Sequence, residues 1–136
     1  NGTVSTTITF VEERTFSTTF GIGGGTSASV DVRLKRFGNK VDIYIPAFTL
    51  TSGGSAASNI AATTNMSTIT ANYVPVADQH IGSIRATDNG TITDGFLFIQ
   101  ATTGSIQLYK SVTAPNWGTS VTVGISNGAT GTYHLT

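Results

Sequence analysis

The sequence predicts an all-β domain of about eight to ten strands, and three observations support this prediction. Threonine-rich runs such as TVSTTITFV and NMSTITANYV place β-branched residues in the pattern that suits a pleated surface. Turn signals that contain Gly or Asn separate the predicted strands, at the spacing of about 8 to 12 residues that is typical of sandwiches and barrels. These turn signals are FGNK, DNGT, TTGS and SNGATG. A helix is hard to place, because even the best candidate, the segment 53–66, shows no apolar stripe at helical spacing.

The length favours one compact unit. With 136 residues, of which 38% are hydrophobic, the chain can bury a substantial core but is short for two domains, so we expect a single domain over 1–136. Between the turn signals, the predicted strands are 4–11, 15–20, 28–37, 40–50, 67–73, 82–86, 91–101, 105–111, 120–125 and 130–135. The alanine-rich segment 53–66 lacks an apolar stripe, and we expect a loop there with a short strand or one helical turn.

Side-chain alternation assigns faces to several of these strands. In KVDIYIPAF, Val41 and Ile43 point to one face while Asp42 and Tyr44 point to the other, as in a sheet with one face in water. Pro46 lacks an amide donor, so this strand is expected to lie near an edge or to bend there.

The strand GFLFIQ differs, because large apolar groups point to both of its faces. One row is Phe96 and Phe98, and the other is Leu97 and Ile99. A strand that is apolar on both faces is buried on both, either within its own domain or against another subunit. We therefore predict that one row fills the core and that the other meets a neighbouring subunit. The residues assigned to the core or to a subunit interface are Phe96, Leu97, Phe98, Ile99, Tyr109 and Tyr133.

The composition argues against several classes of function. Charged residues are only 10% of the chain and balance to zero net charge, so a nucleic-acid partner is not expected; in VRLKRF, Arg33 and Lys35 are interpreted as the solvated face of a strand. There is no cysteine, and no stretch approaches the length of a membrane span. The start NGTVSTT is neither a signal peptide nor a Met start, and we expect a fragment or processed product.

Groups for catalysis are scarce. Only His80 and His134 could act as bases near neutral pH, and there is no cysteine nucleophile or G-x-S-x-G motif. The glycine-rich GIGGGT lacks the lysine of a phosphate-binding loop, and DNGTITD lacks the regular carboxylate spacing of a calcium loop, so both are interpreted as turns. We expect no enzyme activity, no cofactor and no metal site.

Two loops are candidates for binding a small ligand. APNWGTS places Trp117 beside Asn116, and ANYVPVADQH carries Tyr73, Gln79 and His80 in a predicted loop. Aromatic faces next to planar polar groups are what a sugar site requires. The competing interpretation is that Trp117 is buried and closes one end of the domain.

The C-terminal half resembles a known family. The order of motifs in YVPVADQHIGSIRATDNGTITDGFLFIQATTGSIQLYKSV, followed by GTSVTVGISNGATGTYHLT, is similar to the C-terminal jelly-roll knobs of viral and phage fibres, which in turn resemble tumour necrosis factor and complement-head trimers. The resemblance covers roughly 73–136. It implies an antiparallel jelly-roll β-sandwich that packs as a homotrimer, forms the C-terminal head of a longer chain, and recognises a host-cell receptor or glycan from the virion surface.

Two rival functions stay open. A capsid-decorating or head-fibre knob would share the trimer without binding a receptor. A carbohydrate-binding module of a larger enzyme would be a monomer.

Overall fold

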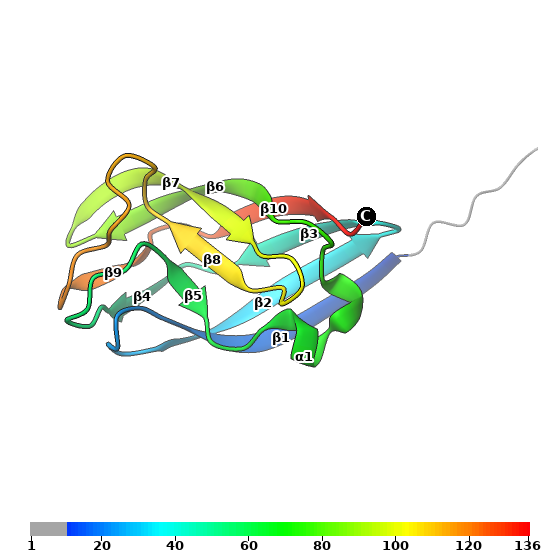
Figure 1. The fold of residues 1–136 in the computed structure, drawn as a ribbon, viewed down its shortest axis with the longest axis horizontal. Helices are drawn as coiled ribbons and strands as arrows, with labels where there is room; N and C mark the ends of the chain where they lie inside the picture. The colour runs from blue at the N-terminus through cyan, green and yellow to red at the C-terminus, as the bar shows by residue number, and fades with distance from the viewer. Residues whose placement is uncertain (1–10) are drawn as a thin grey trace, which may run out of the picture.

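The computed structural model describes residues 11–136, which form ten β-strands and two short helical segments (Figure 1). The strands, in chain order, are β1 (Val11–Gly21), β2 (Ala28–Phe37), β3 (Lys40–Ile45), β4 (Phe48–Thr51), β5 (Ile60–Ala62), β6 (Gln79–Asp88), β7 (Thr91–Ile99), β8 (Ile106–Tyr109), β9 (Thr122–Ile125) and β10 (Ala129–His134). The helical segments are α1 (Met66–Ile69) and the 3₁₀ turn η1 (Ala71–Tyr73). The prediction of an all-β domain with about eight to ten strands is confirmed.

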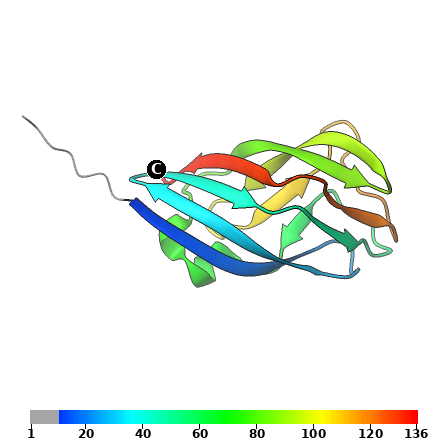
Figure 2. The ribbon, with the colours of Figure 1, turned by 180° about the vertical axis from the view of Figure 1, so that it is seen from behind.

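The strands form one continuous antiparallel sheet that curls into two facing walls. Its order is β10-β3-β2-β1-β5-β8-β7-β6-β9-β4. In Figure 1 the strands β5, β8, β7 and β6 face the viewer, and Figure 2 shows β10, β3, β2 and β1 from behind. We call these the front wall and the rear wall. The C-terminus lies at the end of the molecule where β1 begins, and the loop after β8 lies at the opposite end (Figure 1).

The curl closes where β10 lies beside β6, and two glycines make this approach possible. A Cβ atom on Gly82 would lie 2.3 Å from the carbonyl oxygen of Thr130, and one on Gly131 would lie 2.4 Å from that of Ile81. Any side chain at either position would collide with backbone, because real Cβ atoms do not come this close. The two walls can therefore enclose one core between them.

The core consists of the inward rows of both walls. Its largest fully buried side chains are Tyr73, Tyr133, Phe20, Leu34, Ile43, Ile45, Ile60, Met66, Leu97, Ile99, Ile106 and Leu108. The alternation predicted for 40–45 is confirmed, since Val41, Ile43 and Ile45 are buried while Tyr44 is exposed. Pro46 separates β3 from β4, as expected for a residue without an amide donor.

Three predictions about elements need correction or lie outside the described residues. Most of the predicted strand 4–11 lies outside them, and the predicted strand 15–20 is part of the longer β1. The strand predicted at 67–73 is wrong, because α1 and η1 occupy this segment. Met66, Thr70 and Tyr73 are buried at the i, i+4, i+7 spacing of a helix, a pattern hidden by threonine's preference for strands. For 53–66 we expect a loop with a short strand or one helical turn, and the structure has the short strand β5 there, with α1 beginning at Met66.

No helix in the described part of the chain is long and apolar enough to cross a membrane.

Candidate functional site

The outer face of the front wall carries a cluster of four aromatic rings, which we call the aromatic cluster: His80, Phe96, Phe98 and Tyr109. His80 lies on β6, the two phenylalanines on β7 and Tyr109 on β8. The ring of Phe96 is stacked between two others, with centroids 4.6 Å from His80 and 4.7 Å from Tyr109. Phe98 meets the same two rings edge-on, at 5.5 Å and 6.1 Å. Stacked and edge-to-face contacts at these distances are favourable arrangements of aromatic rings.

Strand alternation separates this cluster from the core. Leu97 and Ile99 are fully buried between the walls, whereas Phe96 and Phe98 are half-buried on the outside. The prediction that one row of this strand fills the core is confirmed, and the row is Leu97 and Ile99. Phe96 and Phe98 are covered in part by their aromatic neighbours, and the rest of their surface faces outward.

A β-bulge places His80 in the cluster. His80 pairs with Phe98 and Gly82 with Leu97, so Ile81 is an extra residue on β6. Because a bulge shifts the alternation, Ile81 and Ile84 both point into the core, while His80 and Ser83 point outward. The prediction that His80 lies in a loop is wrong, because β6 already begins at Gln79.

Hydrogen bonds hold Tyr109 in place at the edge of the cluster. Its hydroxyl donates to Oε1 of Gln107 at 2.8 Å and accepts from Nδ2 of Asn59 at 3.3 Å. These bonds restrict the rotation of the Tyr109 ring, so the edge of the aromatic cluster is ordered within the protomer itself.

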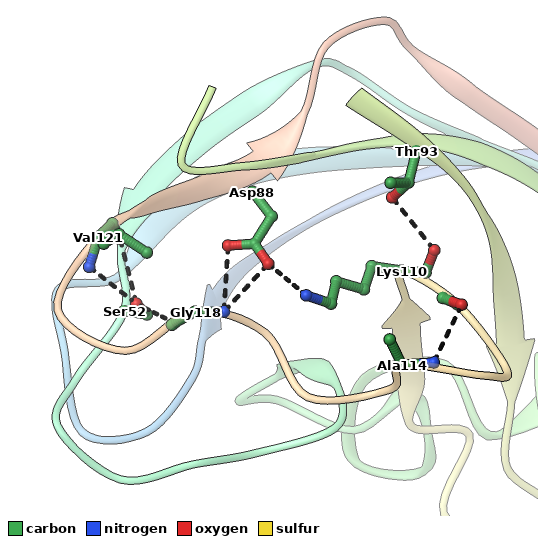
Figure 3. A network of polar contacts seen from close by, with 8 residues as sticks. Ser52, Asp88, Thr93, Lys110, Ala114, Gly118 and Val121 are labelled. Carbon is green, nitrogen blue, oxygen red and sulfur yellow. Dashed lines mark hydrogen bonds and ion pairs between the residues drawn. The ribbon is translucent and has the colours of Figure 1, made fainter. Parts of the chain in front are cut away.

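The end of the molecule that carries the loop after β8 is organised by an ion pair (Figure 3). The ammonium of Lys110 lies 2.5 Å from Oδ2 of Asp88, and both side chains are largely buried, with 17% and 11% of their surface exposed. The two carboxylate oxygens of Asp88 also accept the amide proton of Gly118, at 3.0 and 3.1 Å. These bonds satisfy the buried charge and tie the loop 111–121 to the start of the β6–β7 turn.

A second set of bonds holds the same loop from the other side (Figure 3). The hydroxyl of Ser52 donates to the carbonyl of Gly118 at 2.6 Å and accepts the amide proton of Val121 at 3.1 Å. The amide of Trp117 donates to the carbonyl of Ala57 at 3.0 Å. A hollow of about 480 Å³ lies beside this network, and Asp88, Asn89, Lys110 and Thr119 contribute to its walls.

The two residues predicted for a sugar site in APNWGTS point in different directions. Asn116 is exposed, but Trp117 is 2% exposed and packs in the core. Its indole Nε1 has no hydrogen-bond partner among the described residues. Trp117 is therefore buried, as the competing interpretation expects. Its ring is not available at the surface to stack on a sugar.

The residues predicted in ANYVPVADQH are also separated. Tyr73 is buried, and its hydroxyl donates to Oε1 of Glu12 at 2.6 Å. Burial, together with this bond and the negative charge of Glu12, raises the pKa of Tyr73 to about 12. Gln79 binds the main chain of His134 through both its amide nitrogen and its oxygen, at 2.6 and 2.9 Å, and so links β6 to β10. Of this group, His80 alone joins the aromatic cluster.

Tyr133 lies in the core and is fully buried. Its hydroxyl donates to the main-chain carbonyl of Tyr73 at 2.8 Å. Burial, followed by the proximity of Tyr73, raises the pKa of Tyr133. This hydrogen bond and the burial of both tyrosines link β10 to η1.

Sequence reasoning missed the roles of Asp88 and Lys110. The sequence pattern indicates only a turn at Asp88, and Lys110 lies near the end of the predicted strand 105–111 without any distinguishing motif. The two residues are 22 positions apart, and only the β6–β7–β8 meander brings them together. Within residues 11–136, no group of three His, Asp or Glu side chains is arranged to hold a metal ion.

Comparisons with known proteins show a similar fold and nothing more specific. Neither a protein-family model nor a curated protein matches the sequence. A solved fragment of avian reovirus sigmaC matches with a TM-score of 0.53 and 13% identity, over 92% of this chain and 63% of that chain. The chain thus spans less than two thirds of that fragment.

Two further matches have lower TM-scores. A reovirus attachment protein sigma1, solved in complex with alpha-2,3-sialyllactose, has a TM-score of 0.48 and 14% identity, over 93% of this chain and 66% of that chain. The C-terminal receptor-binding domain of the avian reovirus fibre sigmaC also has a TM-score of 0.48, with 13% identity, over 90% of this chain and 77% of that chain.

Proposed function

We propose that this chain is a head domain of a viral or phage fibre or spike, which attaches the particle to a host-cell surface as a homotrimer of jelly-roll protomers. The observation that carries the proposal is an ordered, outward-facing aromatic cluster on a fold like that of avian reovirus sigmaC. The role contains no catalytic step, and its place is the virion surface.

The aromatic cluster supports self-association. Aromatic residues are enriched at the buried centres of protein interfaces, and charged residues are depleted there. Phe96, Phe98 and Tyr109 are half-buried on the front wall, so a partner could remove the rest of their surface from water. In a closed ring of three, each subunit would bring this face to its neighbour. The trimer would then cover the second apolar face of β7.

Attachment would use the combined strength of several weak contacts. Three equivalent sites on one head, and several heads on one particle, raise the overall avidity through effective concentration. In this proposal the fibre joins the domain at the end where β1 begins. The loop 111–121 and the β6–β7 turn lie at the opposite end, where they would approach the host (Figure 1).

Two measurements on the purified domain test the proposal. Light scattering at micromolar concentration should give the mass of a trimer, and a strict monomer would contradict the trimeric head. Excess domain should reduce adsorption of the parent particle to its host cells. If adsorption is unchanged while the domain is trimeric, the chain is instead a decorating knob without a receptor.

A further inference from the structure

The outer face of the rear wall carries a groove that no part of the proposed trimer explains. It has a volume of about 620 Å³ and crosses β1, β2, β3 and β10. These strands lie side by side in Figure 2. A volume of this size is in the range of about 300 to 1,000 Å³ found for small-ligand sites.

Two rows of side chains cross the floor of the groove, because directly opposed residues of neighbouring antiparallel strands share a face. In the first row, Thr15 is opposite Arg33, Arg33 is opposite Tyr44, and Tyr44 is opposite Thr130. All four side chains are exposed. This row therefore combines a guanidinium, a phenol and two hydroxyls on one accessible line.

The second row is compensated in charge. Lys35 lies between Glu13 and Asp42 in register, with its Nζ 3.4 Å from a Glu13 oxygen. Lys40 lies 3.7 Å from Asp42, whose carboxylate also accepts the hydroxyl proton of Thr132 at 2.8 Å. An extended polyanion such as a nucleic acid would meet these two carboxylates, and its repeated phosphates would be repelled there.

Arg33 is different from the other cations of the groove. Lys35, Lys40 and Arg14 each have a carboxylate within 4 Å, whereas the described residues place none within that distance of Arg33. Instead, its guanidinium lies over the ring of Tyr44, 5.3 Å from the centroid. The stacking holds the planar group while its N–H donors stay available, and such a fork suits the paired oxygens of a carboxylate or sulfate.

We infer that this groove binds an acidic sugar, whose carboxylate or sulfate is held by Arg33 and whose hydroxyls contact Thr15, Tyr44 and Thr130. Among the described residues of the groove, one cation without a carboxylate partner is flanked by hydroxyls, and this matches a ligand with one anionic group and several hydroxyls. The inference rests on the proposed attachment function for its biological role, but the binding itself belongs to the isolated domain and can be measured without any particle.

The test uses three ligands with a common core: alpha-2,3-sialyllactose, sulfated lactose and lactose, each titrated into isotope-labelled domain and followed by NMR. At least one acidic sugar should bind and shift signals of the Arg33 side chain, the Tyr44 ring and the two threonines. Which acidic sugar binds identifies the anionic group. The inference is overturned if neither acidic sugar binds, or if plain lactose binds equally well.

Two variants locate the site. Arg33→Gln should weaken binding by about tenfold or more, the size expected for hydrogen bonds to a charged group. Lys35→Gln removes the same charge two residues along the same strand, and should change affinity by less than about threefold, since exposed ion pairs contribute little. Equal losses in both variants would mean a diffuse charge effect and would overturn the assignment to Arg33.

A cell assay separates this inference from the proposed function. Wild-type domain and Arg33→Gln are compared as competitors of particle adsorption. Weaker competition by the variant supports the groove as the receptor site. Equal competition by both overturns the groove's role and leaves attachment standing, whereas no competition by the wild type contradicts attachment itself.

Discussion

If the domain forms the proposed trimer, replacing Phe96 by aspartate should dissociate it while leaving each protomer folded. Within one protomer, Phe96 contributes two stacked ring contacts, with centroids 4.6 and 4.7 Å from His80 and Tyr109. Each aromatic pair contributes about 0.5 to 1.5 kcal/mol, so the protomer should lose about 1 to 3 kcal/mol. Domains of this kind have unfolding free energies of about 5 to 15 kcal/mol, and the fold should survive.

At the interface the effect is larger. An unpaired carboxylate buried against a neighbour costs at least about 2 kcal/mol, and a ring of three contains three such contacts. The total of about 6 kcal/mol corresponds to a change of about 10⁴-fold in the trimer dissociation constant. Sedimentation velocity over a range of concentrations measures this change directly.

Two further substitutions on β7 serve as controls. Ile92→Asp also replaces an apolar residue by an acid, but Ile92 is 50% exposed and lies outside the aromatic cluster, so the trimer should persist. Leu97→Asp places the charge in the core, where Leu97 is fully buried, and should unfold the protomer. If Phe96→Asp remains as trimeric as the wild type, the front wall is not the subunit interface and this reasoning is refuted.

The remaining predictions concern the stability of the protomer. Trp117→Ala should lower the unfolding free energy by about 3 to 5 kcal/mol, whereas Trp117→Phe should cost much less, because it removes an indole N–H that lacks a partner among the described residues. Denaturant titration compares the two, and equal losses would show that the N–H is bonded. Gly131→Ala should lower the unfolding free energy by about 1 to 3 kcal/mol, because the new Cβ collides with the Ile81 carbonyl. Gly54→Ala has open space around it and should be nearly neutral. Similar melting temperatures for the two variants would contradict the close approach of β6 and β10. Since the folded-state pKa of Tyr73 is raised to about 12, its contribution is complete below pH 10 and is lost as the pH rises toward 12. This loss is about 1.4 kcal/mol for each pH unit in that window, and Tyr73→Phe should reduce the slope of stability against pH by that amount, while the raised pKa of Tyr133 keeps a remaining slope. An unchanged slope would mean that Tyr73 does not carry this dependence.

Much of the fold could be predicted from the sequence where one face of a strand is apolar and the other polar. Val41 to Ile45 alternate as expected, and the tight turns carry their Gly and Asn residues at positive φ, as at Asn89 and Gly90. These features are local, so nearby residues determine them. The prediction failed at 67–73, where Met66 and Tyr73 are anchored in the core and tertiary packing overrides the strand preference of threonine.

The candidate site was only partly predictable. The apolar outer row of β7 signalled an unusual strand, but nothing in the sequence showed that a bulge at Ile81 would bring His80 beside Phe96. Trp117 was the most attractive ligand residue by type, and the structure places it in the core. The pairing of Arg33 with Tyr44 follows from the two-residue turn in FGNK, which fixes the register between β2 and β3, but the pairing of Tyr44 with Thr130 joins strands far apart in the sequence and could not be predicted.

The central claim is that the domain works as a trimeric head, and the mass of the wild-type protein in solution tests it most directly. Sedimentation equilibrium at micromolar concentration should give three times the 14.1 kDa of one chain. A single species at 14.1 kDa would contradict the trimer, and with it the role proposed for the aromatic cluster.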